Sequence, residues 1–161
     1  MKKKFWVILL SVVGILVLFL VTTPVAAADC PSPPSCPCTC NYEGLTPGFW
    51  KNHTNVWPSP YSPNQTLESV FDVPNSFGLD NFTLLQALSF GGGPGNTGMA
   101  KNLLRQAVAA LLNAADPLIN YPVSAANVIL WTNGALAADR ATMEIQKNWW
   151  DQFNNLGSTD Y

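Results

Sequence analysis

Apolar residues recur at helical spacing along most of the chain after residue 80. The longest such stretch begins at Thr97 or Gly98 and ends near Ala115, where Asp116-Pro117 stops it. Its apolar positions are Leu103, Leu104, Ala107, Val108, Leu111, Leu112 and Ala115. A stripe of this width predicts a helix that is buried between other helices.

Three shorter helices are predicted beside this one. Asp80, Ser124 and Asp139 each stand where an N-cap residue would begin a helix. The predicted buried positions are Leu84, Leu85 and Leu88 in the first helix, Val128, Trp131, Ala135 and Ala138 in the second, and Ile145, Trp149 and Phe153, with Met143 and Trp150 alongside, in the third. No alternating pattern of useful strand length is present. The predicted fold class is therefore all-α, a bundle of four to five helices over residues 44–161.

The first 28 residues have the pattern of an export signal. A basic start at residues 2–4 precedes an apolar run over residues 5–21, and small residues follow up to Ala28. An uncleaved signal-anchor helix is the alternative, because the run is long for a signal core and short for a membrane span. Both interpretations export the rest of the chain. The predicted localisation is extracellular or at the cell surface, with membrane contact only through this segment.

All four cysteines lie in a proline-rich arm over residues 29–43: Cys30, Cys36, Cys38 and Cys40. Proline at this density favours an extended chain, and an even cysteine count outside the cell predicts disulfides. Pairing Cys30 with Cys38 and Cys36 with Cys40 avoids the smallest, most strained rings. A thiolate metal site and crosslinks between chains stay open as alternatives. The arm is predicted to be a stiff spacer.

A compact aromatic and polar motif precedes the helices. It runs from Gly44 to His53 (GLTPGFWKNH), contains the only histidine of the chain, and is followed by Trp57-Pro58. This segment resembles the opening of a family of secreted bacterial and archaeal proteins that begin TPGFWKNH or TQGYWKNH. The likeness continues through residues 83–93, 102–115 and 154–157. The resemblance implies an exported helical domain, and it implies no activity.

Five residues of this segment are candidate binding residues: Trp50, Lys51, Asn52, His53 and Trp57. Tryptophan faces beside amide and ammonium donors suit a glycan or a ligand that carries a carboxylate. In the competing structural interpretation, both tryptophans pack on the helices, while Asn52 and His53 hydrogen-bond to the backbone of the turn. The two interpretations differ in whether these side chains line a concavity or fill the core.

Three Asn-x-Thr triplets could accept an N-linked glycan, and they begin at Asn52, Asn64 and Asn81. Such triplets arise by chance in a chain that is rich in asparagine. They matter only where exported proteins are glycosylated.

The exported part of the chain is acidic and poor in charge. After residue 28, the basic side chains are Lys51, Lys101, Arg105, Arg140 and Lys147, against ten Asp and Glu. That balance argues against nucleic acid or an anionic membrane surface as a partner. No serine stands in a nucleophile-elbow motif beside the histidine. We therefore predict no catalytic residue, no cofactor and no metal.

These observations favour an exported, non-catalytic surface module that is structural or binds a partner. The expected partners are cell-wall glycan or identical subunits. One alternative is a secreted hydrolase that uses His53 with an unidentified carboxylate. The second is metal binding by the cysteine arm.

Overall fold

The computed structural model describes residues 41–161, so the predicted export signal and the four cysteines of the arm lie outside the described residues. Within this range the helices are α1 (Pro47–Asn52), α2 (Leu84–Ala87), α3 (Gly95–Ala115), α4 (Ala125–Leu136) and α5 (Arg140–Asn154). The 3-10 helices η1 (Thr54–Val56), η2 (Leu67–Ser69) and η3 (Asn75–Phe77) lie between α1 and α2. The prediction of an all-α fold is confirmed for these residues. None of the helices over 41–161 combines the length and apolar character needed to cross a membrane.

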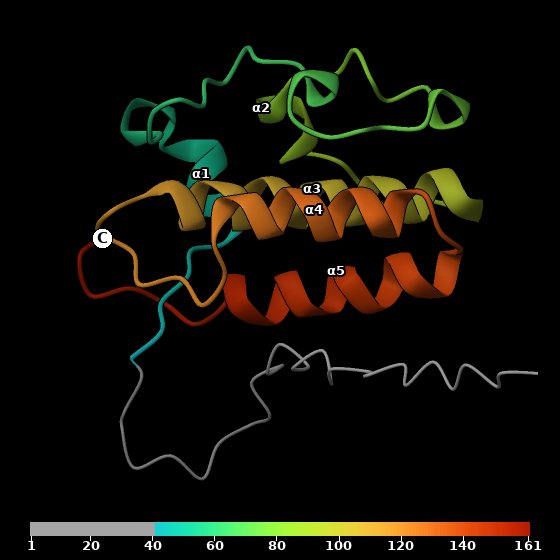
Figure 1. The fold of residues 1–161 in the computed structure, drawn as a ribbon. Coiled ribbons are helices and arrows are strands. Elements are labelled where there is room, and N and C mark those ends of the chain that lie inside the picture. The colour runs from blue at the N-terminus through green and yellow to red at the C-terminus, as the bar shows by residue number, and fades with distance from the viewer. Residues whose placement is uncertain (1–40) are drawn as a thin grey trace, which may run out of the picture. The chain divides into compact units, whose positions relative to one another are not determined.

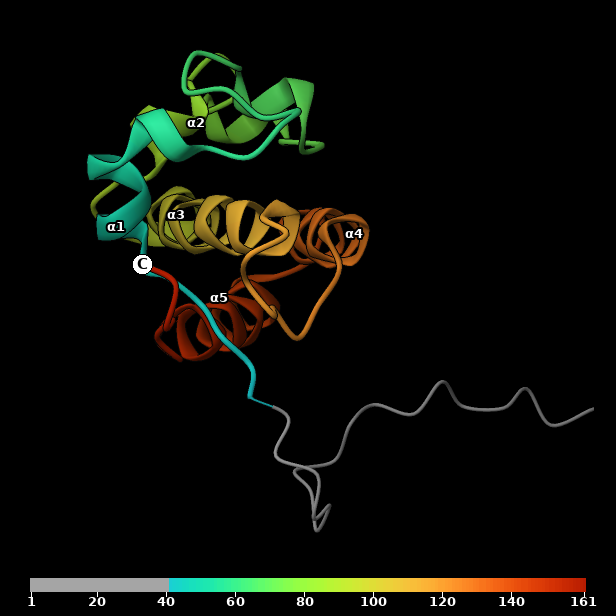
Figure 2. The same ribbon diagram turned by 90° about the vertical axis from the view of Figure 1, so that its left-hand side faces the viewer.

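Helix α3 lies at the centre of the domain, as its wide apolar stripe predicts. It packs against α1, α2, α4 and α5. Figures 1 and 2 show α4 beside α3, α5 against one side of this pair, and the long connection from α1 to α2 against the other. Six of the seven predicted stripe positions are fully buried: Leu103, Leu104, Ala107, Val108, Leu111 and Leu112.

The N-caps of the last two helices are confirmed, and that of α2 is wrong. Ser124 and Asp139 accept hydrogen bonds from the backbone N–H groups three residues later. Helix α2 is capped by Thr83 and not by Asp80, and it covers a single turn. Thr83 and Gln86 form a reciprocal capping box, whereas the Asp80 carboxylate accepts from its neighbour Asn81. A satisfied reciprocal cap sets the start of the helix three residues later than the sequence predicts.

The predicted inner faces of α4 and α5 are also wrong in part. Helix α5 buries Met143, Trp150 and Asn154, and its apolar pair Ile145 and Trp149 is exposed. Hydrogen bonding sets the orientation of α5, because Asn154 must point inward to reach its hydrogen-bond partners on α3.

Helix α4 shows the same kind of difference. It buries Thr132 where the sequence predicts Trp131, because the Thr132 hydroxyl accepts a hydrogen bond from the Trp150 indole at 3.2 Å. The predicted Ala138 is exposed as well.

The two ends of the described chain are joined beside α1. Gly44 and Gly157 exchange backbone hydrogen bonds of 2.8 and 2.9 Å. A side chain at Gly44 would place a Cβ only 2.0 Å from the Phe153 carbonyl oxygen, so this close approach requires glycine. The Glu43 carboxylate accepts from the backbone N–H groups of Thr159 and Asn120 at 3.1 and 3.2 Å.

We expect Glu43→Gln to lower the melting temperature at neutral pH and to flatten its decline in acid. The backbone N–H donors of Thr159 and Asn120 hold the pKa of Glu43 below its ordinary value of 4.5. A carboxylate with a lowered folded-state pKa stabilises the fold above its unfolded pKa, and that stabilisation is lost as the pH falls through the folded pKa. Melting curves from pH 7 to pH 3 test this, with the exposed Glu144→Gln as control. Parallel curves for Glu43→Gln and the unaltered protein would contradict it.

Candidate functional site

The two tryptophans of the motif hold it on the helices. Trp50 is fully buried, and its indole Nε1–H donates to Oδ1 of Asn113 on α3 at 3.0 Å. Trp57 is half-buried, and its Nε1–H donates to the Trp50 carbonyl oxygen at 2.9 Å. The Thr46 hydroxyl caps α1, the helix that carries Trp50. The structural interpretation of these two residues is therefore confirmed.

The polar residues of the motif lie on the outside of α1. Lys51, Asn52 and His53 are all exposed. The His53 ring stacks on Phe49 with centroids 4.2 Å apart, and its Nδ1–H donates to the Phe49 carbonyl oxygen at 2.8 Å. The contacts that the structure gives this ring involve no serine and no carboxylate. The five predicted binding residues are thus divided between core and surface, and they do not converge on one concavity.

A buried chain of amide side chains links the motif to α3 and α5. Asn113 accepts from the Leu45 backbone N–H as well as from Trp50, and it donates to the Leu45 carbonyl and to Asn154 Oδ1. Asn154 donates in turn to the backbone and the side chain of Gln106 at 3.0 Å. Sequence reasoning missed this chain, because an asparagine in a helical pattern is ordinarily assigned to the surface. Every amide group in it has a partner, which makes the docking of the motif specific.

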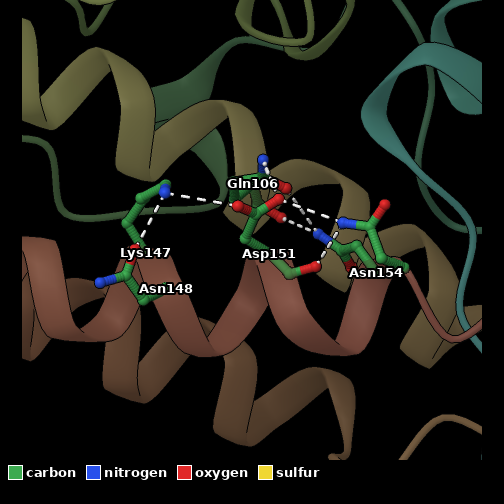
Figure 3. Close-up of polar contacts among 6 residues, drawn as sticks. Gln106, Lys147, Asn148, Asp151 and Asn154 are labelled. Carbon is green, nitrogen blue, oxygen red and sulfur yellow. Dashed lines mark hydrogen bonds and ion pairs between the residues drawn. The ribbon is translucent and has the colours of Figure 1, made fainter.

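A shallow polar hollow of about 310 Å³ lies where this chain reaches the surface. Its polar lining consists of Thr46, Arg105, Gln106, Asp151 and Asn155. Figure 3 shows Asp151 between its donors: Gln106 Nε2 at 3.0 Å and Lys147 Nζ at 3.4 Å. Beside it, the buried Nε of Arg105 has no hydrogen-bond partner among residues 41–161. The hollow offers donors and acceptors to a small polar molecule, and none of its lining side chains is a Ser, Cys or Lys nucleophile.

Large apolar side chains of α4 and α5 are also exposed, and we call these residues together the tryptophan face. It consists of Leu130 and Trp131 on α4 with Ile145 and Trp149 on α5, which are between 37% and 64% exposed. The rings of Trp131 and Trp149 meet edge to face at a centroid distance of 6.4 Å. Trp131 also stacks on the buried Trp150 at 5.9 Å, which fixes its ring. Trp131, Ile145 and Trp149 were predicted as buried positions, and the structure places them on the exposed sides of their helices.

No group of three or more metal-ligating side chains occurs among residues 41–161. The cysteine arm, where the metal alternative was placed, lies outside the described residues. No family model, no curated protein and no solved structure matches this chain.

Proposed function

We propose that this protein is an exported, non-catalytic surface module that associates with identical subunits through the tryptophan face. The observation that carries the proposal is the composition of α4. Its twelve residues, AANVILWTNGAL, include no charged side chain, yet its outer face is exposed in the isolated chain. Its exposed side carries the large apolar residues Leu130 and Trp131 beside the amide of Asn127. Large apolar side chains grouped on a protein surface ordinarily mark a contact site for another molecule. With only twelve residues, α4 is also too short to span a bilayer.

The absence of charge on α4 favours a second copy as the covering partner. A two-fold contact joins the same patch of both copies, and the residues on the axis meet their own counterparts, so a patch without charge brings no like charges together. The exported part is acidic overall, and copies would repel one another through most of their surface. The uncharged face of α4 is where two copies approach at the least electrostatic cost. Its exposed tryptophans are the residue type that dominates binding energy in protein interfaces.

The remainder of the proposal concerns the segments before the domain. Residues 1–28 would export the chain or anchor it, and the Cys/Pro-rich arm would hold the helical bundle away from the surface. The arm would end before Glu43, whose carboxylate is bound within the domain. The resemblance of the GLTPGFWKNH segment to exported proteins supports the same placement. Lys51 on α1 and His53 at its C-cap are exposed, and cell-wall glycan is the alternative partner.

Sedimentation of the exported protein over a range of concentrations tests the proposal, under reducing conditions so that cysteine crosslinks do not contribute. We expect self-association that Trp149→Glu weakens by roughly thirtyfold, the equivalent of about 2 kcal/mol for a central tryptophan. Leu118→Glu is the matched control, since Leu118 is 56% exposed and lies outside the tryptophan face.

A monomer at every concentration would overturn the proposal. In that case, cosedimentation with insoluble wall material that depends on Trp149 would establish the glycan alternative.

A further inference from the structure

We propose that Asn52, Asn64 and Asn81 carry N-linked glycans, which would cover the side of the domain built from α1 and the α1–α2 connection. The inference rests on the export of the chain and is independent of its self-association. Each of the three asparagines begins an Asn-x-Thr triplet with a residue other than proline in the middle. The fold adds two observations that the sequence does not contain.

The first observation is accessibility. All three asparagines are exposed: Asn52 ends α1, Asn64 lies in the loop before η2, and Asn81 lies in the turn before α2. The structure gives the side-chain amides of Asn52 and Asn64 no hydrogen bond within residues 41–161. The Asn81 amide donates only to the adjacent Asp80 carboxylate, at 2.7 Å. A bulky hydrophilic group on these nitrogens would displace no packed element of the domain.

The second observation is how the fold uses its other asparagines. Asn113 and Asn154 are fully buried in the amide chain. Asn120 and Asn133 bond to segments far away in sequence, through Asn41 and Asp72. None of these four has Ser or Thr two residues later. Within residues 41–161, the triplets are thus confined to asparagines that the fold does not need.

The position of the three sites agrees with the proposed contact surface. Figures 1 and 2 show α1 and the α1–α2 connection on the side of α3 that faces away from α5. Residues 44–90 contain few charged side chains: Lys51, Glu68, Asp72 and Asp80. Glycans there would hydrate a surface with little charge of its own. The tryptophan face carries no triplet and would stay bare for contact.

The modification requires one co-reactant, an oligosaccharide on a lipid diphosphate, together with a membrane-bound transferase. The asparagine Nδ2 attacks the anomeric carbon, a C–N bond forms, and the C–O bond to the diphosphate breaks. The lipid diphosphate leaves with the bonding electron pair, and the amide nitrogen gives up one proton to a base. No oxidant or reductant takes part.

Mass spectrometry of the protein exported by its own cells tests the inference. Trypsin cuts after Lys51 and Lys101 and leaves all three sites in one peptide, and cleavage after Glu68 then separates Asn81 from the other two. We expect each site to carry hexose-containing mass, and each Asn→Gln variant to lose one glycan from the intact protein. Thr54→Ala should remove the glycan of Asn52 although the asparagine is kept.

Asn127→Gln is the matched control, because Asn127 is exposed and has isoleucine two residues later. It should leave the intact mass otherwise unchanged. The proposal is overturned for any site whose Asn→Gln variant loses no glycan from the intact protein. Self-association would be unaffected by that result, since the tryptophan face lies on other helices, so the two proposals fail separately.

Discussion

Trp50→Ala lowers the free energy of unfolding by about 3–5 kcal/mol, because it empties a large, fully enclosed site. The Trp50 side chain is inaccessible to solvent, and its ring meets Phe49 and Tyr161 edge to face at 5.3 and 6.3 Å between centroids. The substitution also leaves Asn113 without one of its two donors. Urea unfolding followed by far-ultraviolet circular dichroism measures the change.

Trp149→Ala is the control for this loss. It removes the same side chain from a position that is 46% exposed, so we expect a loss below about 1 kcal/mol. Equal stability of Trp50→Ala and the unaltered protein would mean that the ring is not buried in solution. The structural role that we assign to the motif would then be wrong.

Asn113→Leu should cost about 4 kcal/mol or more, although leucine has the same branched shape. Asn113 serves Leu45, Trp50 and Asn154 through four hydrogen bonds. Each buried group that loses its partner costs about 1–3 kcal/mol. A more apolar residue in the core therefore destabilises the protein, which is opposite to the effect that burial of apolar area alone would give. Asn127→Leu on the exposed side of α4 is the control, with an expected change within about 0.5 kcal/mol.

A double-mutant cycle separates the amide chain from the packing. Trp50→Phe keeps an aromatic ring and removes the indole donor to Asn113. If the hydrogen bond is formed in solution, the losses of Trp50→Phe and Asn113→Leu should be non-additive by about 0.5–3 kcal/mol. Strict additivity would show that the two residues act independently and that the motif is held by ring packing alone.

The residues that stabilise the fold are different from those that we propose to mediate self-association. The amide chain and Trp50 fix the motif on α3, while the tryptophan face lies on the outer sides of α4 and α5. A variant such as Trp149→Glu should therefore change association with little change in the melting curve. Loss of folding in Trp149→Glu would instead place Trp149 among the residues that hold α4 and α5 together.

The sequence by itself determined the all-α class, the central helix and two of the N-caps. The stripe from Leu103 to Leu112 is wide enough that only burial between helices accounts for it, and all six of its residues in that range are fully buried. Ser124 and Asp139 cap helices because a short polar side chain before an apolar period satisfies the free N–H groups locally. The capping box of Thr83 and Gln86 is equally local, but the sequence also offers Asp80 as a competing cap three residues earlier.

Only the tertiary structure decided which sides of α4 and α5 face inward, and where the motif residues lie. Periodicity assigns apolar residues to the core and amides to the surface. In α5 this rule fails twice, because Trp149 is exposed and Asn154 is buried. Asn154 is inside because Gln106 and Asn113 on α3 and Tyr121 in the connection after α3 supply its hydrogen-bond partners. Partners distant in sequence also decide where the motif residues lie. Trp50 is buried beside Asn113, whereas His53, three residues later, is exposed. A buried polar group is stable only beside its partners, and those partners are brought together by the fold and not by the order of residues in the chain.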